Sequence, residues 1–222
     1  ALLVKRAEAI VPTETFYTGK HLVSGKTYVA GLSFDVRPVR GGVFQPLLCH
    51  WPAIGMGDQD HVRRVHVELA GSVARVVRER VDEIGVLVLG DFNDEPHAAP
   101  MCDAFSATRD VLVARRAETG LLYNAAWRWL VRLRPFDGRD ATELPAGTHY
   151  YRSGVESRWR TYDQLLVSSV LLQGYGWTLR EDERRVWYGD VLKGGRGAFL
   201  ASSTRSGSVD HLPILTTLEY IL

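Results

Sequence analysis

A carboxylate and a carboxamide two positions apart are the first residues in this chain that could do chemistry. Asp91 and Asn93 belong to the tetrapeptide Gly-Asp-Phe-Asn at 90–93, which directly follows the apolar run 86–89. Such a run is typical of a strand buried on both faces, and positions two apart on an extended segment point the same way. The pair could hold a hard metal ion or orient a water molecule beside a phosphate. The alternative is an Asx turn that caps the strand.

Three further strand ends carry an acid or an imidazole. Asp163 begins an apolar segment, and Asp210 and His211 directly precede the last one, at 214–222. His50 ends the segment 43–50. Hydrolysis of a phosphodiester requires a neutralised anion, an oriented water and a protonated leaving oxygen. Acids, an amide, imidazoles and a metal ion together meet those requirements.

In chain order these segments resemble the endonuclease/exonuclease/phosphatase superfamily, which includes deoxyribonucleases, abasic-site endonucleases and inositol polyphosphate phosphatases. The resemblance covers residues 1–222 but depends on short motifs, above all Gly-Asp-Phe-Asn followed at this separation by Asp-His. It implies an α/β (α+β) fold, a four-layer sandwich of two mostly antiparallel β-sheets flanked by helices. It also implies an active site at one end of the sandwich and Mg²⁺ or Mn²⁺ as the cofactor.

The resemblance assigns catalytic roles to six residues, namely His50, Asp91, Asn93, Asp163, Asp210 and His211. Asp91 corresponds to the residue that orients or deprotonates the attacking water. Asn93 corresponds to an amide that binds the phosphate or a metal-bound water. His211 corresponds to a histidine that contacts the scissile phosphate. The metal ligands implied are Asp91, Asn93 and Asp210, although Asp210 could instead hold the imidazole.

Two of these residues have structural alternatives. Asp163 corresponds to an acid that polarises the histidine, but it could simply cap the start of a strand. His50 corresponds to a second histidine facing the phosphate, but it could pack on Trp51. Cys49 precedes His50 on the same strand and should face the opposite way, into the core.

Two residues that the family supplies upstream have no counterpart in this sequence. They are an Asn on the first strand and a metal-binding Glu after the second. Glu8 and Glu14 follow the segment 1–4, which we match to a later strand, so they are poor substitutes. We therefore expect a single domain over 1–222 that is incomplete at its N-terminus.

The segment 109–160 favours nucleic acid as the substrate. It holds ten arginines against six acids, with aromatic residues between them, and arginine suits phosphates while aromatic rings suit bases. We take four residues in or near it as substrate-binding candidates: Asn124, Tyr150, Arg152 and Arg160. The alternative is a helix over 121–133 with core tryptophans and surface arginines. His149 could add a contact to the phosphate, but it is expected to be an exposed loop residue.

Apolar periodicity predicts the elements that must position these side chains. Alternation over 28–36 and the return at 43–50 predict a hairpin. Apolar residues spaced by 3.6 over 62–84 predict an amphipathic helix whose charged residues face solvent. Strands are expected at 1–4, 162–170 and 214–222, and the charged segment 174–197 is expected at the surface.

Composition excludes several classes of protein. A chain of 222 residues with 45% hydrophobic content suits one folded domain, and a net charge of +1 excludes a polycation. Two cysteines without close spacing make no zinc site and no disulfide framework. The sequence holds no membrane-spanning run and no secretory signal. We expect a cytoplasmic protein with no membrane partner, and the sequence indicates no oligomeric state.

The function expected is divalent-metal-dependent hydrolysis of phosphodiester bonds, most simply by a nuclease. One alternative is a phosphatase that acts on a small phosphorylated metabolite or an inositol phosphate. The other is a non-catalytic relative that binds nucleic acid, which the absent upstream Glu would favour.

Overall fold

The computed structural model describes most of the chain. The described residues are 11–23 (backbone only), 26–38, 40–53, 58–80, 83–116, 120–131, 145–151, 158–187 and 211–222. The strand expected at 1–4 lies outside the described residues. So do Glu8 and the candidate site residues Arg152 and Asp210.

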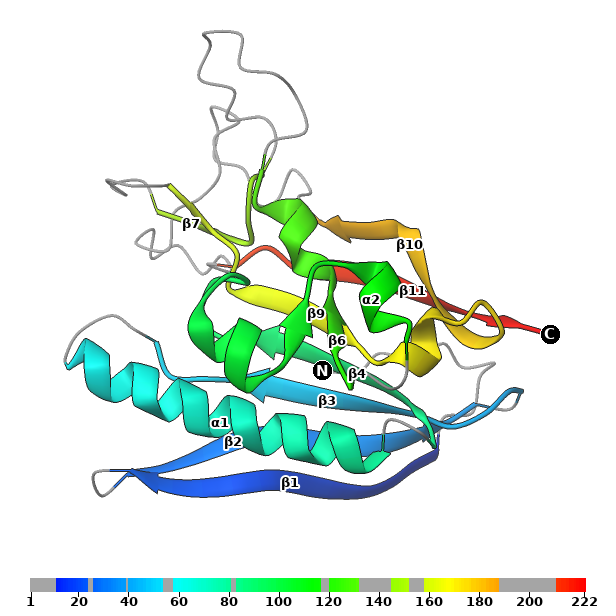
Figure 1. Cartoon of the computed structure of the whole chain (residues 1–222), viewed down its shortest axis with the longest axis horizontal. Helices are drawn as coiled ribbons and strands as arrows, with labels where there is room; N and C mark the ends of the chain where they lie inside the picture. The colour runs from blue at the N-terminus through cyan, green and yellow to red at the C-terminus, as the bar shows by residue number, and fades with distance from the viewer. Residues whose placement is uncertain are drawn as a thin grey trace, which may run out of the picture.

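One mixed sheet organises the molecule (Figure 1). Its strands lie in the order β1-β2-β3-β4-β9-β6-β5. They are β1 (Val11–Val23), β2 (Lys26–Arg37), β3 (Phe44–His50), β4 (Gly85–Asp91), β5 (Ala107–Thr108), β6 (Leu122–Asn124) and β9 (Asp163–Val167). β3 runs parallel to β4, and β9 runs antiparallel to it on the other side. The predicted hairpin forms, since β2 and β3 pair antiparallel.

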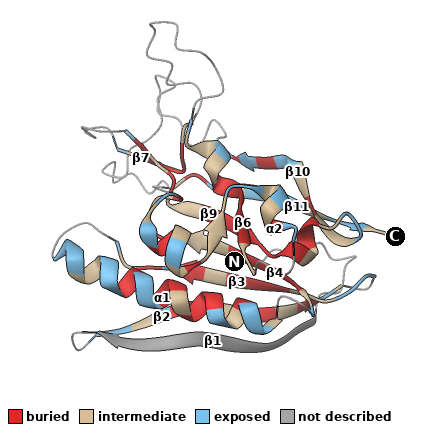
Figure 2. Ribbon diagram, in the orientation of Figure 1, coloured by how far each residue is buried: buried red, intermediate tan, exposed pale blue. Residues whose placement is uncertain are grey.

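The predicted amphipathic helix is α1 (Gln59–Arg80), which packs against the sheet (Figure 2). Val65, Leu69 and Val73 are fully buried, and Val77 is nearly so. The charged side chains on the other side of the helix are exposed, as expected from the sequence. The buried stripe therefore fixes which side of α1 faces the strands.

β4 is buried on both faces, as its uninterrupted apolar run predicts. Val86 and Val88 join the cluster under α1, while Leu87 joins a second cluster with Leu165 on the opposite face. The sheet is therefore covered on both sides, and the end of β4 is held between two cores.

Two small sheets complete the described architecture. β10 (Gly176–Val186) pairs with β11 (Ile214–Ile221) and packs on the second cluster, while β7 (His149–Tyr150) pairs with β8 (Trp159–Arg160). The α/β class is confirmed. In the described residues the sheet formed by β10 and β11 has two strands. The described layers are therefore helix α1, the large sheet and this small sheet.

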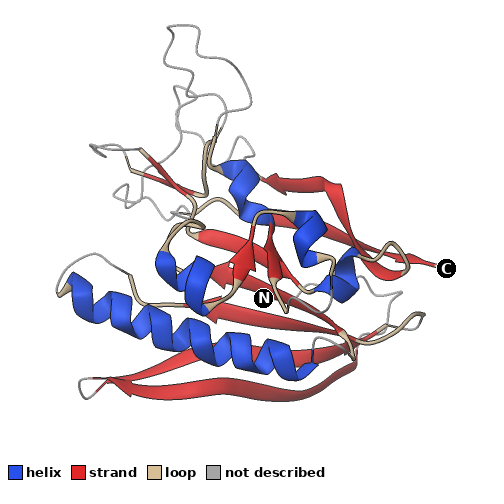
Figure 3. Ribbon diagram, in the orientation of Figure 1, coloured by secondary structure: helices blue, strands red, loops and turns tan. Residues whose placement is uncertain are grey.

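The remaining helical segments are short (Figure 3). They are η1 (Pro100–Ala104), α2 (Val111–Ala114), η3 (Ala125–Trp129) and η4 (Ser169–Leu172). The alternative helix over 121–133 does not form in its described part, 121–131. There β6 pairs with β9, and Asn124 accepts a hydrogen bond from the Ala126 N–H, which starts η3 instead. No helix in the described ranges is both long and apolar enough to cross a membrane.

Candidate active site

The register of the sheet brings three candidate residues together at one end of three neighbouring strands. His50 at the end of β3 lies opposite Asp91 at the end of β4, and Asp163 at the start of β9 lies opposite Asp91 from the other side. Asp91 is thus the central residue of three neighbouring strands. No sequence pattern specifies this order, because it depends on β9 inserting beside β4.

Gly90 permits this close arrangement of strand ends. Its φ of +146° lies in a region that L side chains rarely adopt, and a Cβ there would overlap the carbonyl group of Cys49. Glycine is therefore needed where the backbone of β4 approaches β3 just before Asp91.

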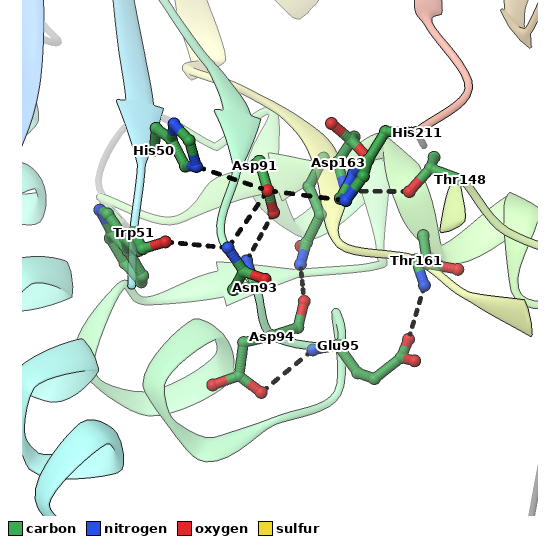
Figure 4. Close-up of polar contacts among 11 residues, drawn as sticks. His50, Trp51, Asp91, Asn93, Asp94, Glu95, Thr148, Thr161, Asp163 and His211 are labelled. Carbon is green, nitrogen blue, oxygen red and sulfur yellow. Dashed lines mark hydrogen bonds and ion pairs between the residues drawn. The ribbon is translucent and has the colours of Figure 1, made fainter. Parts of the chain in front are cut away.

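The Asp91 carboxylate is flanked by two imidazoles (Figure 4). Its Oδ2 lies 3.8 Å from Nε2 of His50 and 3.9 Å from Nε2 of His211. The pKa of the Asp91 carboxyl is raised above its ordinary value, chiefly by burial. The Asn93 backbone N–H and nearby His211 lower this pKa in part, and the Asp163 charge raises it. A cation beside this half-buried carboxylate would stabilise its ionised form.

His211 is held by Asp163. Its Nδ1 lies 2.7 Å from Asp163 Oδ2. An ionised carboxylate only accepts, so Nδ1 carries the hydrogen and Nε2 is directed toward Asp91. Thr148 connects the two segments, because its hydroxyl accepts from the Asp163 N–H at 3.0 Å and its carbonyl accepts from the Leu212 N–H at 2.7 Å.

Asn93 has its carboxamide orientation fixed by two acceptors. Its Nδ2 donates to the Trp51 carbonyl at 2.9 Å and to Asp91 Oδ2 at 3.1 Å. Since both partners only accept, the nitrogen must face them, and Oδ1 is the atom that Asn93 offers to a ligand. The backbone N–H of Asn93 also donates to Asp91 Oδ1 at 2.8 Å. The Asx turn that was an alternative to a functional role is therefore present alongside the candidate site.

Two sequence predictions near the site need correction. Asn124 was a substrate-binding candidate, but it is fully buried, and its Nδ2 donates to Gln164 Oε1 at 2.7 Å while its Oδ1 caps η3. Both ends of that amide are engaged inside the protein. His149 was expected in an exposed loop, but it is 3% exposed and its ring centroid lies 4.5 Å from that of His211. A β-bridge between these two residues draws His149 inward.

The other substrate-binding candidates differ in placement. Tyr150 is half-buried and packs on Trp159, with ring centroids 5.0 Å apart. Arg160 is half-buried, and its charge lowers the pKa of Glu95, which burial raises. Arg152 and Asp210 lie outside the described residues.

Sequence reasoning missed a buried polar layer beneath these residues. Gln164 is fully buried, and its Nε2 donates to the Asp94 backbone carbonyl at 2.6 Å. His66 and Asp94, both buried, lie 3.1 Å apart. The signal that could have found His66 is a histidine on the apolar stripe of the predicted helix, beside Val65.

Of the three metal ligands that the resemblance implies, two lie among the described residues. They are the Asp91 carboxylate and Asn93 Oδ1, the hard donors that Mg²⁺ prefers. Within the described ranges no three His, Cys, Asp or Glu side chains are grouped so that they could hold a metal ion. These residues fit a cation that keeps several of its water ligands.

Solved structures share this fold. A functionally unknown conserved protein from Enterococcus faecalis V583 matches with a TM-score of 0.53 and 13% identity, over 95% of this chain and 67% of that one. The endonuclease/exonuclease/phosphatase from Bacteroides vulgatus matches with a TM-score of 0.50 and 14% identity, over 96% and 66%. The 3'-5' exonuclease NExo from Neisseria meningitidis matches with a TM-score of 0.51 and 14% identity, over 96% and 73%.

The chain therefore has the fold of endonuclease/exonuclease/phosphatase proteins, as its motifs predicted. It spans about two thirds of the length of the first of these chains. No protein-family model matches the sequence, and no curated protein does. At these identities the likeness establishes the fold and leaves the activity to be argued from the site.

Proposed function

We propose that this protein hydrolyses phosphodiester bonds with a divalent metal ion and that nucleic acid is its substrate. The observation that carries the proposal is the Asp91 carboxylate, flanked by two imidazoles, of which His211 is paired with Asp163. We infer that the protein has the four-layer sandwich typical of this class.

Each side chain has a chemical role in the proposal. Asp91 accepts a hydrogen bond from the attacking water and takes its proton. Asp163 stabilises the cationic form of His211, so that Nε2 donates to a phosphate oxygen. His50, which is exposed, approaches from the opposite flank and donates to the leaving oxygen.

The metal ion would be Mg²⁺ or Mn²⁺. Asp91 and Asn93 Oδ1 would hold it, together with Asp210, and it would supply neutralisation of the phosphate charge. Asn93 keeps its oxygen directed toward the ligand because both amide hydrogens are bound by the protein.

Nucleic acid is the substrate to test first. The sequence segment 109–160 is rich in arginines with aromatic residues between them. In addition, a structure of the Neisseria 3' phosphatase NExo holds a product DNA hairpin. We propose that Tyr150, Arg152 and Arg160 contact the substrate beside the catalytic residues.

The test is a cleavage assay on DNA and RNA with Mg²⁺ or Mn²⁺. Asp91→Ala and His211→Ala should each lower the rate by about 10²- to 10⁴-fold, and chelation by EDTA should abolish cleavage. Asp103→Ala, at an exposed acid in η1, is the matched control and should cut at the parent rate. If both site variants cut as fast as the parent, the proposal is wrong. Release of inorganic phosphate from a small phosphorylated metabolite or inositol phosphate, with polynucleotide left intact, would instead indicate a phosphatase.

A further inference from the structure

His66 occupies an unusual position, inside helix α1 with no exposed surface. Its Nε2 lies 2.8 Å from the Pro52 carbonyl oxygen, and its Nδ1 lies 3.1 Å from Asp94 Oδ2. Pro52 follows the end of β3, and Asp94 follows the end of β4. One helical side chain therefore binds both of the loops that leave the catalytic strands.

The hydrogen positions in this cluster follow from its partners. A backbone carbonyl only accepts, so Nε2 of His66 must donate to Pro52. One further proton must lie between Nδ1 and Asp94 Oδ2, because two bare acceptors at 3.1 Å would repel each other. Asp94 Oδ1 accepts in turn from the Glu95 N–H at 3.0 Å. His66 is thus bonded on both nitrogens and anchored to a carboxylate that is itself fixed.

Both partners of His66 adjoin groups that hold Asn93. Asp94 is the next residue along the chain. Pro52 follows Trp51, whose carbonyl accepts the hydrogen bond from Asn93 Nδ2 at 2.9 Å. The two hydrogen bonds of His66 therefore hold the chain segments on both sides of the Asn93 carboxamide. The His66 ring also lies beside the Trp51 indole, with ring centroids 5.5 Å apart.

Asn93 needs such support because its backbone is in an uncommon conformation. Its φ is +49°, in the left-handed region, which asparagine enters more readily than other non-glycine residues but still at a cost in free energy. A residue held there persists only where its surroundings over-determine it. The loop after β3 and the loop after β4 also contact each other directly, since the Trp51 N–H donates to the Asp91 carbonyl at 2.9 Å, and His66 adds a bond to each loop from a third element.

We propose that His66 is a positioning residue that holds the Asn93 carboxamide in its ligand-binding orientation. The inference rests on the proposed function, in which Asn93 Oδ1 serves the reacting phosphate and its metal ion. The competing view is that His66 is only a satisfied core residue, whose loss would change stability and nothing else.

The experiment compares three variants of His66 with a control in the same helix. His66→Asn can place a donor where Nδ1 lies and keep the hydrogen bond to Asp94. His66→Gln can place a donor where Nε2 lies and keep the hydrogen bond to Pro52. His66→Ala keeps neither bond. Val73→Ala, also fully buried in α1, opens a cavity in the core but removes no hydrogen bond to either loop. All variants are assayed at temperatures where they are folded, which circular dichroism checks.

Loss of both hydrogen bonds of His66 should affect substrate turnover more than substrate binding. His66→Ala should lower kcat by about 10- to 100-fold, as expected for a group that orients a ligand, with KM within about threefold of the parent. His66→Asn and His66→Gln should each recover part of that loss. Val73→Ala should keep the parent kcat. Equal kcat values for His66→Ala and Val73→Ala would overturn the proposal, and the Asn and Gln variants carry the comparison if His66→Ala does not fold.

A second measurement does not depend on activity. The side-chain amide of Asn93 can be identified in a ¹⁵N NMR spectrum by its absence in Asn93→Asp. Its two hydrogens should shift in His66→Ala, because the groups that accept them move, and should stay in place in Val73→Ala. Unchanged Asn93 signals in His66→Ala would contradict the positioning role. A parent protein that cleaves nothing would contradict the proposed function, and the NMR result would then decide the role of His66 by itself.

Discussion

Neighbouring side chains on β3 meet opposite environments. Cys49 is 5% exposed and faces the core, whereas the side chain of His50 is 82% exposed and faces Asp91. The alternation of a strand accounts for the difference, since successive residues point to opposite faces. It makes one residue inert and leaves the other available for chemistry.

Thiol alkylation tests this alternation. Burial raises the pKa of the Cys49 thiol, and burial together with the Asp103 charge raises the pKa of Cys102. The thiolate is the reactive form, so a raised pKa lowers reactivity at neutral pH, and the alkylation rate of Cys102 should go on rising above about pH 8.5, where that of an ordinary thiol levels off. In native protein, iodoacetamide should modify Cys102 slowly and Cys49 only after unfolding. Mass spectrometry after a pH series measures both, and earlier labelling of Cys49 would show that β3 faces the other way.

Strand β4 carries a constraint that its apolar run does not reveal. Gly90 allows the backbone to approach β3 with a positive φ, and this approach sets Asp91 opposite His50. Another glycine, Gly71 in α1, has open space where a Cβ would lie. The same substitution should therefore have opposite effects at these two positions.

Gly90→Ala should lower the free energy of unfolding by about 2–4 kcal/mol, because it combines a strained φ with a steric overlap. Gly71→Ala should raise it by about 0.5–1 kcal/mol, since alanine favours a helix. Urea denaturation measures both values. Similar stability in the two variants would contradict the close approach of β4 and β3.

A buried arginine connects the large sheet to the sheet formed by β10 and β11. Arg184 on β10 donates to the Tyr123 hydroxyl of β6 at 3.0 Å and lies 3.3 Å from Glu181, which also pairs with Arg128 at 3.2 Å. Its side chain is 2% exposed. The charged segment expected at the surface thus contributes an inward-facing residue of strand β10.

Arg184→Met should destabilise the protein by about 2–4 kcal/mol, because it removes the buried cation that donates to Tyr123 and pairs with Glu181. The lower part of this range reflects Glu181, which is 31% exposed and keeps Arg128. Arg180→Met, on the same strand but at an exposed ion pair, should change stability little. Thermal and urea unfolding compare the two variants. A larger loss from Arg180→Met would contradict the contact between the sheets.

Much of this architecture follows from the sequence by local rules. The periodicity of 62–84 predicts α1, alternation predicts the β2–β3 hairpin, and an unbroken apolar run predicts β4 between two cores. The same strand ends supply His50, Asp91, Asn93, Asp163 and His211, which the structure brings together. These features are readable because burial repeats with the period of the element itself.

The tertiary structure decides what side chains do once distant segments meet. Asp163 and His211 are 48 positions apart, and Asn124 faces inward because Gln164, 40 positions away, accepts its hydrogen bond. His66 gains its two partners only when α1 packs beneath the ends of β3 and β4. Periodicity places a residue on a face of its own element, but the strand order β3-β4-β9 determines which residue it meets there.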